Sequence, residues 1–399
     1  MTNTRNKKTK ILRVITRLNI GGPAIHVTLL TGMFNDGEFE SALLCGSVSE
    51  REGDMGYIAE DYGVKPLYIP QLTREISVFR DLAAFFSIIK HIKRYKPDIV
   101  HTHTAKAGTL GRIAAILSRV PVIVHTFHGN VFQGYFSKRR TKLFIIIERI
   151  LARFTDCIIA ISPAQKEEIT KLYRITRPDK CRVVRLGFDL ERLSGALENG
   201  RGLRDDLKLA ESDILVGIIG RLTAIKNQKM FVDMAYHLIN TGESRLKERL
   251  KFAVIGDGEL REELLAYTRF RGLAKKIFFV GWAKDMRKVY PALDIVTLTS
   301  SNEGTPVTLI EAMSFSKPVV ATDTGGIKDT VRENGILVKK DDYKSMAHAV
   351  SELAVSREKR ESLGRLGRDF VRATYSKERL YSEFRQLYND LEKQKRRTK

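Results

Sequence analysis

Long apolar runs are absent from this sequence. No uninterrupted stretch of apolar residues reaches the roughly 18 to 20 that a membrane-spanning helix requires. The opening residues, MTNTRNKKTK, are basic and lead directly into a strand-like segment, so the apolar core of a signal peptide is also missing. We therefore expect a cytoplasmic protein, with peripheral attachment to the inner face of the membrane as an open alternative.

Cysteine is scarce as well. The chain has 3 cysteines, Cys45, Cys157 and Cys181, which have no metal-like spacing. An odd number of cysteines without ligand spacing argues against both a disulfide framework and a zinc cluster. The prediction is three buried free thiols in a reducing compartment.

Acidic residues are in deficit. The chain has 47 Asp and Glu against 69 Lys and Arg, which gives a formal net charge of +22. Solvated ends of the chain would explain part of this excess, and the rest favours an anionic partner. We find no nucleic-acid recognition motif and no strands that interleave aromatic and basic residues, so we expect no nucleic-acid partner. An anionic membrane surface fits the charge better.

What the sequence does contain is a regular alternation of short apolar segments and helical patterns. Its 399 residues, 43% of them apolar, are enough for two domains. The strand-like segments are residues 11–16, 41–45, 67–69, 99–102, 122–126, 214–219, 252–255, 277–280, 295–298, 318–321 and 336–338. This alternation predicts an α/β fold with parallel, doubly wound sheets, in which ligands bind at the carboxyl ends of the strands.

The most informative stretch is residues 293–326, LDIVTLTSSNEGTPVTLIEAMSFSKPVVATDTGG. A strand leads to a loop that carries Glu303, and Thr305 and Pro306 then suit the N-cap and the first position of a helix. Glu311 follows about one turn into that helix. The unpaired backbone N–H groups of a helix start favour a phosphate. The ordinary alternative is that both acids only complement the helix dipole.

The second half of the chain opens with a strand and a cationic loop, GRLTAIKNQ. Arg221 and Lys226 stand in this loop, at the end of the strand at residues 214–219. Two cations at a strand end suit a diphosphate, although solvation would explain either one alone.

Near the start of the chain, a glycine-rich loop joins a strand to a helix. Gly21 and Gly22 let a ligand approach the backbone closely, and Pro23 suits the helix start before His26. A plain tight turn is the equal alternative.

Four histidines end two strands of the first half: His101, His103, His125 and His128. Their grouping raises the possibility of a metal site, but no carboxylate or cysteine accompanies them at ligand spacing. Histidines at strand ends can equally be structural.

Two segments of the first half are both amphipathic and basic. They are residues 79–96, FRDLAAFFSIIKHIKRYK, and residues 136–154, FSKRRTKLFIIIERILARF. One reading is that of ordinary helices that face the core and have a solvated rim. The other is a membrane-surface patch that gives access to a lipid-linked acceptor.

These motifs together resemble those of the retaining GT-B glycosyltransferases of family 4. The resemblance is carried in order by GG-x-x-x-H, H-G, G-R-L-x-x-x-K, E-x7-E and T-G-G, and it covers nearly the whole chain. It implies two facing Rossmann-like domains, an acceptor-binding domain at residues 1–187 and a nucleotide-sugar domain at residues 188–375. Residues 376–399 would form a helix that returns to the first domain, followed by a basic tail.

The resemblance also implies roles for single residues. Arg221 and Lys226 would clamp the donor diphosphate, Glu303 would contact the sugar hydroxyls, and Glu311 would contact the ribose. His128 would contact the donor sugar near its reacting carbon. The further donor contacts that it implies are Gly21, Gly22, Gly258, Trp282, Gly304, Thr305, Pro306 and Val307. His103 and Lys106 are weaker candidates for contacts to the acceptor.

The function implied is transfer of a sugar from a nucleotide diphosphate sugar, in the manner of a hexosyltransferase. The donor would be a UDP-sugar and the acceptor a glycan or lipid-linked molecule of cell-surface polysaccharide or glycolipid synthesis. No D-x-D motif stands at a strand end, so we expect no metal requirement and no cofactor. A GT-B epimerase or phosphorylase and a non-catalytic basic protein that binds lipid or nucleic acid remain alternatives. In the segment CRVVRLGFD, Arg185 and Leu186 replace the Pro and Asn that are usual in the family.

Overall fold

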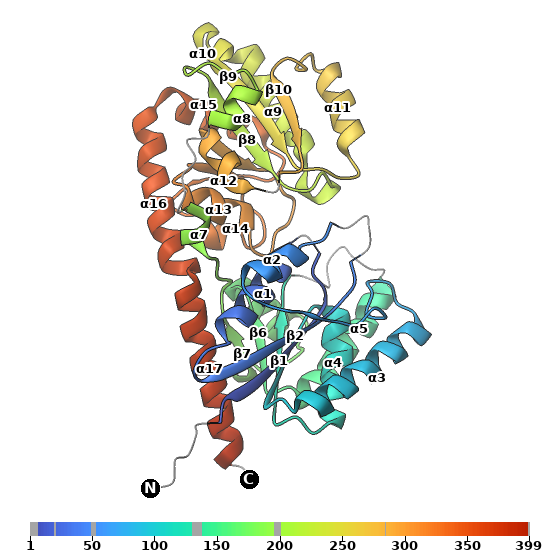
Figure 1. Ribbon diagram of the computed structural model, residues 1–399. Helices are drawn as coiled ribbons and strands as arrows, with labels where there is room; N and C mark the ends of the chain where they lie inside the picture. The colour runs from blue at the N-terminus through green and yellow to red at the C-terminus, as the bar shows by residue number, and fades with distance from the viewer. Residues whose placement is uncertain are drawn as a thin grey trace. The chain divides into compact units, whose positions relative to one another are not determined.

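The computed structural model describes residues 7–19, 21–48, 53–129, 138–194, 201–283 and 285–397 (Figure 1). The chain forms two compact units. The first consists of Met1–Phe188 together with Lys377–Lys399, and the second is Asp189–Ser376. No helix among the described residues is both long enough and apolar enough to cross a bilayer.

The first unit is built on a parallel sheet with the strand order β3-β2-β1-β4-β5-β6-β7. The strands are β1 (Thr9–Arg17), β2 (Phe39–Gly46), β3 (Leu67–Tyr68), β4 (Ile99–His103), β5 (Val122–Phe127), β6 (Cys157–Ala160) and β7 (Cys181–Val183). The order reverses between β1 and β4, and in doubly wound sheets such a reversal at the carboxyl edge is where ligands bind.

Helices cover both faces of this sheet. They are α1 (Gly22–Met33), α2 (Gly56–Asp61), α3 (Val78–Tyr95), α4 (Ala105–Leu117), α5 (Lys138–Phe154), α6 (Pro163–Glu167), η1 (Glu168–Leu172), η2 (Pro178–Lys180) and α17 (Lys377–Arg397). The central strands are buried along their whole length, as expected for strands with helices on both faces.

Helix α17, from the C-terminal end of the chain, belongs to this first unit. Its Leu380, Phe384 and Tyr388 are fully buried in the core formed by α1 and the central strands. The guanidinium of Arg379 donates to the carbonyls of Arg185 (2.9 Å) and Leu186 (2.6 Å). The two residues that depart from the family wording therefore anchor α17 through their backbone.

The second unit has a parallel sheet with the order β10-β9-β8-β11-β12-β13. Its strands are β8 (Ile214–Ile219), β9 (Leu250–Ile255), β10 (Ile277–Gly281), β11 (Ile295–Leu298), β12 (Val319–Thr322) and β13 (Ile336–Val338). Here the order reverses between β8 and β11. The helices are α7 (Leu190–Ser194), α8 (Arg201–Asp206), η3 (Ala224–Lys226), α9 (Gln228–Thr241), α10 (Ser244–Arg249), α11 (Arg261–Phe270), α12 (Met286–Val289), η4 (Tyr290–Ala292), α13 (Val307–Ser314), α14 (Ile327–Thr330), α15 (Tyr343–Val355) and α16 (Arg357–Tyr375).

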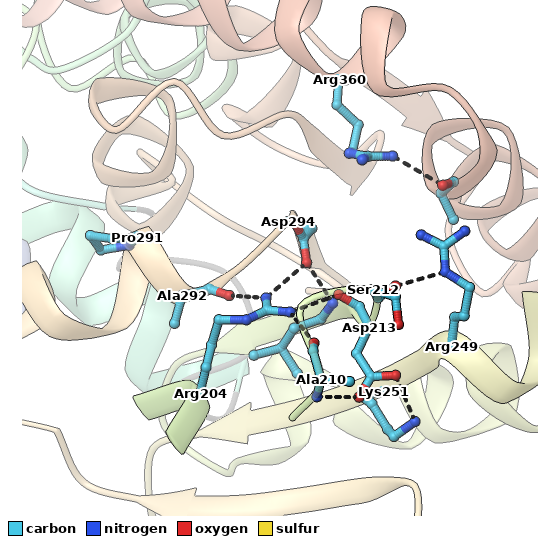
Figure 2. A network of polar contacts seen from close by, with 12 residues as sticks. Arg204, Ala210, Ser212, Asp213, Arg249, Lys251, Pro291, Ala292, Asp294 and Arg360 are labelled. Carbon is cyan, nitrogen blue, oxygen red and sulfur yellow. Dashed lines mark hydrogen bonds and ion pairs between the residues drawn. The ribbon is translucent and has the colours of Figure 1, made fainter. Parts of the chain in front are cut away.

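A polar network closes the amino-terminal edge of the second sheet (Figure 2). Arg204 of α8 donates to the carbonyls of Ala292 (3.0 Å) and Asp213 (2.7 Å) and to the carboxylate of Asp294 (3.2 Å). That carboxylate also accepts from the N–H of Leu215 (2.7 Å). Because β8 and β11 are fixed to each other at this end, their opposite, carboxyl ends are positioned relative to each other.

The fold prediction is confirmed: both sheets are parallel and doubly wound, in two Rossmann-like units. The three cysteines are free and buried, as expected. Strands β6 and β7 were not anticipated. Strand β6 illustrates the reason. Figure 1 shows it among the other strands of the first unit. Its four residues are too short an apolar run to distinguish from the end of the preceding helix by periodicity alone.

Candidate functional site

The reversal point of the second sheet brings together two residues that lie 77 positions apart in the chain, Lys226 and Glu303. The ammonium of Lys226 contacts the Oε1 atom of Glu303, and both side chains are largely buried. The hydroxyl of Ser300 donates to the same Oε1 at 2.8 Å, and the hydroxyl of Thr299 donates to the carbonyl of Lys226 at 2.8 Å. The loops after β8 and β11 therefore form one preorganised cation–carboxylate pair.

The loop after β12 supports this pair through two glycines. The N–H of Gly326 donates to the carbonyl of Glu303 at 2.7 Å. A Cβ atom on Gly326 would lie 1.9 Å from the carbonyl oxygen of Gly304. A Cβ atom on Gly325, which has a φ of +53°, would lie 2.3 Å from the carbonyl oxygen of Glu303. Glycine is required here because two backbone segments touch. The T-G-G motif thus sets the position of Glu303.

The start of α13 differs in detail from the prediction. The helix begins at Val307 and Pro306 is its N-cap, whereas Thr305 was expected as the cap and Pro306 as the first helical residue. The N-cap position has no side-chain hydrogen bond, and the N–H of Val307 donates to the carbonyl of Thr305 (3.0 Å). Pro306 has no backbone N–H. The helix begins after it, one residue later than the sequence rule predicts.

Glu311 lies about one turn into α13, as expected, and is half-buried. The hydroxyl of Tyr290 donates to its Oε2 atom at 2.7 Å. Burial raises the pKa of Glu311 to about 7, and the hydrogen bond from Tyr290 lowers it by less. The carboxyl group of Glu311, with its pKa raised to about 7, therefore changes its charge near neutral pH.

The loops after β8, β9 and β10 adjoin at the same carboxyl edge. Arg221 is exposed and forms no ion pair with any residue that the structure describes, so its charge is available to a ligand. Gly258 has a φ of +159° and packs against the β8 loop, because a Cβ atom on it would lie 2.5 Å from the carbonyl of Leu222. Trp282 follows β10 and is about half exposed.

In the first unit, three histidines meet at the carboxyl ends of β4 and β5. The Nδ1 atom of His103 lies 2.9 Å from the Nε2 atom of His128, which makes a hydrogen bond whose direction depends on the tautomers. The ring of His26, from α1, lies 5.2 Å from the ring of His128 and 6.1 Å from that of His103. His128 is half-buried, whereas His103 and His26 are buried behind it.

Behind this group, His101 continues the series into the core. Its ring lies 4.2 Å from that of His103, and its Nδ1 atom lies 2.8 Å from the hydroxyl of Tyr388 on α17. Tyr388 in turn accepts from the buried guanidinium of Arg13 at 3.3 Å. A hydrogen-bonded and ring-contact series thus runs from Arg13 to His128.

His125 does not belong to this group. Neighbouring residues of a strand point to opposite faces of the sheet, so His125 faces α4, where its ring would lie 2.5 Å from a Cβ atom on Gly108. Its Nδ1 atom lies 2.9 Å from the hydroxyl of Thr102. The expectation of four clustered histidines is therefore corrected: His26 replaces His125.

Burial makes these five histidines poor bases. It lowers the pKa of His128 to about 3 and lowers the pKa values of His26, His101, His103 and His125 well below the ordinary value. At neutral pH they are uncharged and act as hydrogen-bond donors and acceptors. Within the described part of the chain, no group of histidine, cysteine or acidic side chains is arranged to hold a metal ion.

The remaining residues singled out in the first unit lie near this edge. Gly21 is the N-cap of α1 with a φ of +153°, and Gly22 is the first residue of that helix. The ammonium of Lys106 is paired with Asp81 and donates to the carbonyl of Glu75 at 2.6 Å, so its charge is already neutralised within the protein.

Sequence reasoning missed several residues that position the groups above. Ser300 could have been found, since it stands in the polar run before Glu303. No local sequence motif marks Tyr290, Arg13 or Tyr388. Each is distant in sequence from the residue that it contacts, and each looks like an ordinary part of a strand or helix.

Comparisons with known proteins support the same interpretation. The family model described as Glycosyltransferase Family 4 matches residues 20–192, and that described as Glycosyl transferases group 1 matches residues 213–355. The UDP-Gal:alpha-D-GlcNAc-diphosphoundecaprenol alpha-1,3-galactosyltransferase of Escherichia coli is 32% identical over 317 residues, which cover 78% of this chain and 79% of that protein. The GalNAc-alpha-(1->4)-GalNAc-alpha-(1->3)-diNAcBac-PP-undecaprenol alpha-1,4-N-acetyl-D-galactosaminyltransferase of Campylobacter jejuni is 26% identical, with 66% of this chain and 67% of that protein covered.

Among solved structures, HepE of Anabaena in complex with UDP superposes with a TM-score of 0.80. It is 20% identical in sequence, and the match covers 96% of this chain and 100% of that protein. The sucrose-phosphate synthase of Thermosynechococcus elongatus superposes with a TM-score of 0.77, at 18% identity and with 96% and 99% covered. These likenesses establish the GT-B fold.

Proposed function

Because this chain belongs to the family 4, group 1 glycosyltransferases, we propose that it transfers a sugar from a UDP-sugar to a glycan or lipid-linked acceptor with retention of anomeric configuration. The observation that carries the proposal is the pair of Lys226 and Glu303 at the reversal point of the second sheet. In doubly wound sheets this point is where ligands bind.

The relatives support the choice of donor and acceptor. The Escherichia coli relative is named for a UDP-Gal donor and a diphosphoundecaprenol-linked acceptor, and the Campylobacter jejuni relative also acts on an undecaprenol-linked glycan. A Staphylococcus aureus relative, 25% identical over 83% of this chain, is named for capsular polysaccharide biosynthesis. A place in cell-surface polysaccharide or glycolipid synthesis is consistent with these names.

The cations of the β8 loop account for departure of the nucleotide diphosphate. When the bond between the sugar and the diphosphate breaks, negative charge develops on the leaving phosphate. The exposed Arg221 and the ammonium of Lys226 lie in one loop and can stabilise that charge. Lys226 would turn from Glu303 towards the phosphate, which frees Oε1 to accept from a sugar hydroxyl.

The histidine series accounts for orientation of the sugar rather than for proton abstraction. His128 is neutral and half-buried, and its Nδ1 atom has no partner among the residues that the structure describes. With Nε2 held by His103, the ring can present Nδ1 to a sugar hydroxyl. Since none of these histidines is an effective base, a phosphate oxygen of the donor would remove the proton of the acceptor on the same face, which gives retention.

The proposal includes independence from metal ions, because the chain has no D-x-D motif and the cations of the β8 loop supply the positive charge that a metal would bring. Transfer in excess chelator should match transfer in its absence. Complete loss, restored by Mg²⁺ or Mn²⁺, would contradict this part of the proposal.

The direct test of the function is product identification. UDP-sugars are first screened for binding, and the best binder is incubated with a membrane lipid extract. Mass spectrometry should then detect a lipid-linked acceptor that has gained one sugar, and NMR should detect the same anomeric configuration in product and donor. A product with inverted configuration, or an epimerised nucleotide sugar without transfer, would contradict the proposal.

A further inference from the structure

The outer surface of helices α3 and α5 exposes a row of large apolar side chains. On α3, Phe79, Leu82 and Phe86 recur at positions i, i+3 and i+7, and Phe79 is 87% exposed. On α5, the exposed residues at spacings of three and four are Leu143, Ile146, Ile150 and Phe154. Residues at these spacings share one face of a helix, so each helix turns an apolar stripe towards solvent.

Each of these helices has a single acidic residue, and each acid is turned inward. Asp81 of α3 pairs with Lys106, and Glu148 of α5 is buried against Arg112 at 2.7 Å. Both cations stand on α4, which packs between α3 and α5 (Figure 1). The only carboxylates of the two helices are thereby neutralised within the protein.

The charges that remain on the exposed faces of the two helices are positive, and one of these cations, Arg80, lies 3.7 Å from the carboxylate of Glu75 in the preceding loop. The exposed cations of the two helices are Arg80, Lys90, Lys93, Arg94, Lys142, Arg149 and Arg153. Apolar stripes bordered mainly by cations are the surface that an anionic lipid interface accepts, since the stripes enter the boundary of the acyl chains and the cations meet the headgroups. A soluble partner protein would not require that every acid be withdrawn.

One end of this surface, the start of α3, lies at the edge of the first sheet that also carries the histidine group. In a parallel sheet each helix starts at the carboxyl edge, where the preceding strand ends. The apolar residues at the start of α3, Ile76, Val78 and Phe79, therefore lie on the same edge of the sheet as His128.

We propose that the outer surface of α3 and α5 docks onto an anionic lipid bilayer and holds the histidine edge of the first unit at the headgroup level. The inference rests on the proposed function only for the lipid-linked acceptor, whose sugar-bearing end would then lie within reach of His128. Both helices lie on the surface; neither enters the bilayer as a span.

Vesicle flotation without donor or acceptor tests the inference. The protein should float with vesicles that contain phosphatidylglycerol, float less with pure phosphatidylcholine, and dissociate as salt is raised, because screening shortens the reach of the surface charges. The double variants Phe79→Ser/Phe86→Ser and Ile146→Ser/Ile150→Ser should each bind at least about tenfold more weakly, since burial of one such side chain in an apolar phase is worth roughly that factor.

Phe270→Ser is the matched control. Phe270 is 82% exposed on α11 of the second unit, so its loss should leave flotation unchanged. Equal flotation of wild type and both double variants would overturn the inference, and so would equal binding to neutral and anionic vesicles. Dimers of the wild type that the double variants abolish, without any vesicle binding, would show instead that the surface joins two copies.

Transfer to a short water-soluble acceptor separates this inference from the proposed function. The double variants should transfer to it at the wild-type rate. Vesicle binding without transfer would contradict the function alone, and transfer without vesicle binding would contradict the docking surface alone.

Discussion

At the scale of single residues, Lys226 and Glu303 form one unit in the structure, whereas the sequence motifs imply two separate roles. The sequence motifs alone imply that Lys226 binds the donor diphosphate and that Glu303 binds the sugar hydroxyls. In the structure they contact each other, and Ser300 and Thr299 fix both. Under the proposed function, a donor would exchange this internal contact for two new ones, one with each residue.

Replacement of the two residues should separate these roles. Lys226→Ala should weaken binding of bare UDP about tenfold or more, since a charge-assisted hydrogen bond is worth about 1.5–3 kcal/mol. Glu303→Gln should leave UDP binding unchanged or slightly stronger, because the ammonium is released, while turnover of the UDP-sugar falls. Titration calorimetry measures both affinities. An equal loss of UDP binding in the two variants would be inconsistent with these roles.

Glu311 should make donor binding depend on pH. Its pKa is raised to about 7, so the folded protein holds the proton between the ordinary value near 4.5 and pH 7. This contribution to stability is present at low pH and is lost as pH rises through that window. Donor binding should have the opposite trend under the proposed ribose role of Glu311, because a carboxylate can accept from both ribose hydroxyls whereas the protonated acid cannot.

The affinity for UDP should accordingly rise between pH 6 and pH 8. Glu311→Gln should remove this rise and leave a flat profile, which fluorescence titration at several pH values can measure. Should the variant keep the wild-type pH profile, another group would be responsible and the ribose role of Glu311 would be wrong.

At the scale of elements, tight loop contacts and the C-terminal helix hold the site in place. Gly326→Ala should destabilise the second unit by about 1–3 kcal/mol and reduce donor affinity, because its Cβ atom would meet the carbonyl of Gly304 at 1.9 Å. Gly202→Ala is the control in the same unit, with no heavy atom within 4 Å of the added Cβ. Urea unfolding measures the difference, and equal free energies of unfolding for the two variants would contradict this account of the T-G-G loop.

Helix α17 has a corresponding role in the first unit. Tyr388→Phe removes the hydroxyl shared by Arg13 and His101 and leaves both side chains buried with one partner fewer, which should cost about 1–3 kcal/mol. Tyr381→Phe removes a hydroxyl that donates to the partly buried Asp36, where water can replace it. If both variants unfold at the same urea concentration, the buried series is not a structural support of His103 and His128.

The sequence predicted the elements of the fold well because each strand–loop–helix step has a local signal. Turn glycines, apolar runs and the polar residues at strand ends are all close together in the chain. The candidate residues Arg221, Lys226, Glu303 and Glu311 could be named for the same reason, since each stands in a compact motif. What could not be predicted is contact between distant segments: the pairing of Lys226 with Glu303, and the choice of His26 over His125 for the histidine group.

At the scale of the whole molecule, the two units should respond differently to acid. The five histidines with lowered pKa values all belong to the first unit, and these low pKa values keep them neutral when folded. The unfolded chain gains protons below a pKa of about 6.5, so stability is lost as pH falls below that value, by up to about 1.4 kcal/mol per histidine and pH unit. Glu311, in the second unit, acts in the opposite direction.

The single tryptophan, Trp282, reports on the second unit alone. Urea unfolding at pH 5.5 should show circular dichroism changing before tryptophan fluorescence, whereas the two curves should lie closer together at pH 7.5. Curves that shift together by the same amount on acidification would show that the buried histidines do not control the stability of the first unit.

The central claim is that the protein is a sugar transferase whose donor site is the Lys226–Glu303 pair. The measurement that tests it most directly is the rate of UDP release from the bound UDP-sugar, with and without a lipid-linked acceptor, for the wild type and Lys226→Ala. We expect UDP release from the wild type to depend on the acceptor, and we expect its rate to be at least about tenfold lower in Lys226→Ala. Release at the same rate without an acceptor, or unchanged release in Lys226→Ala, would contradict it.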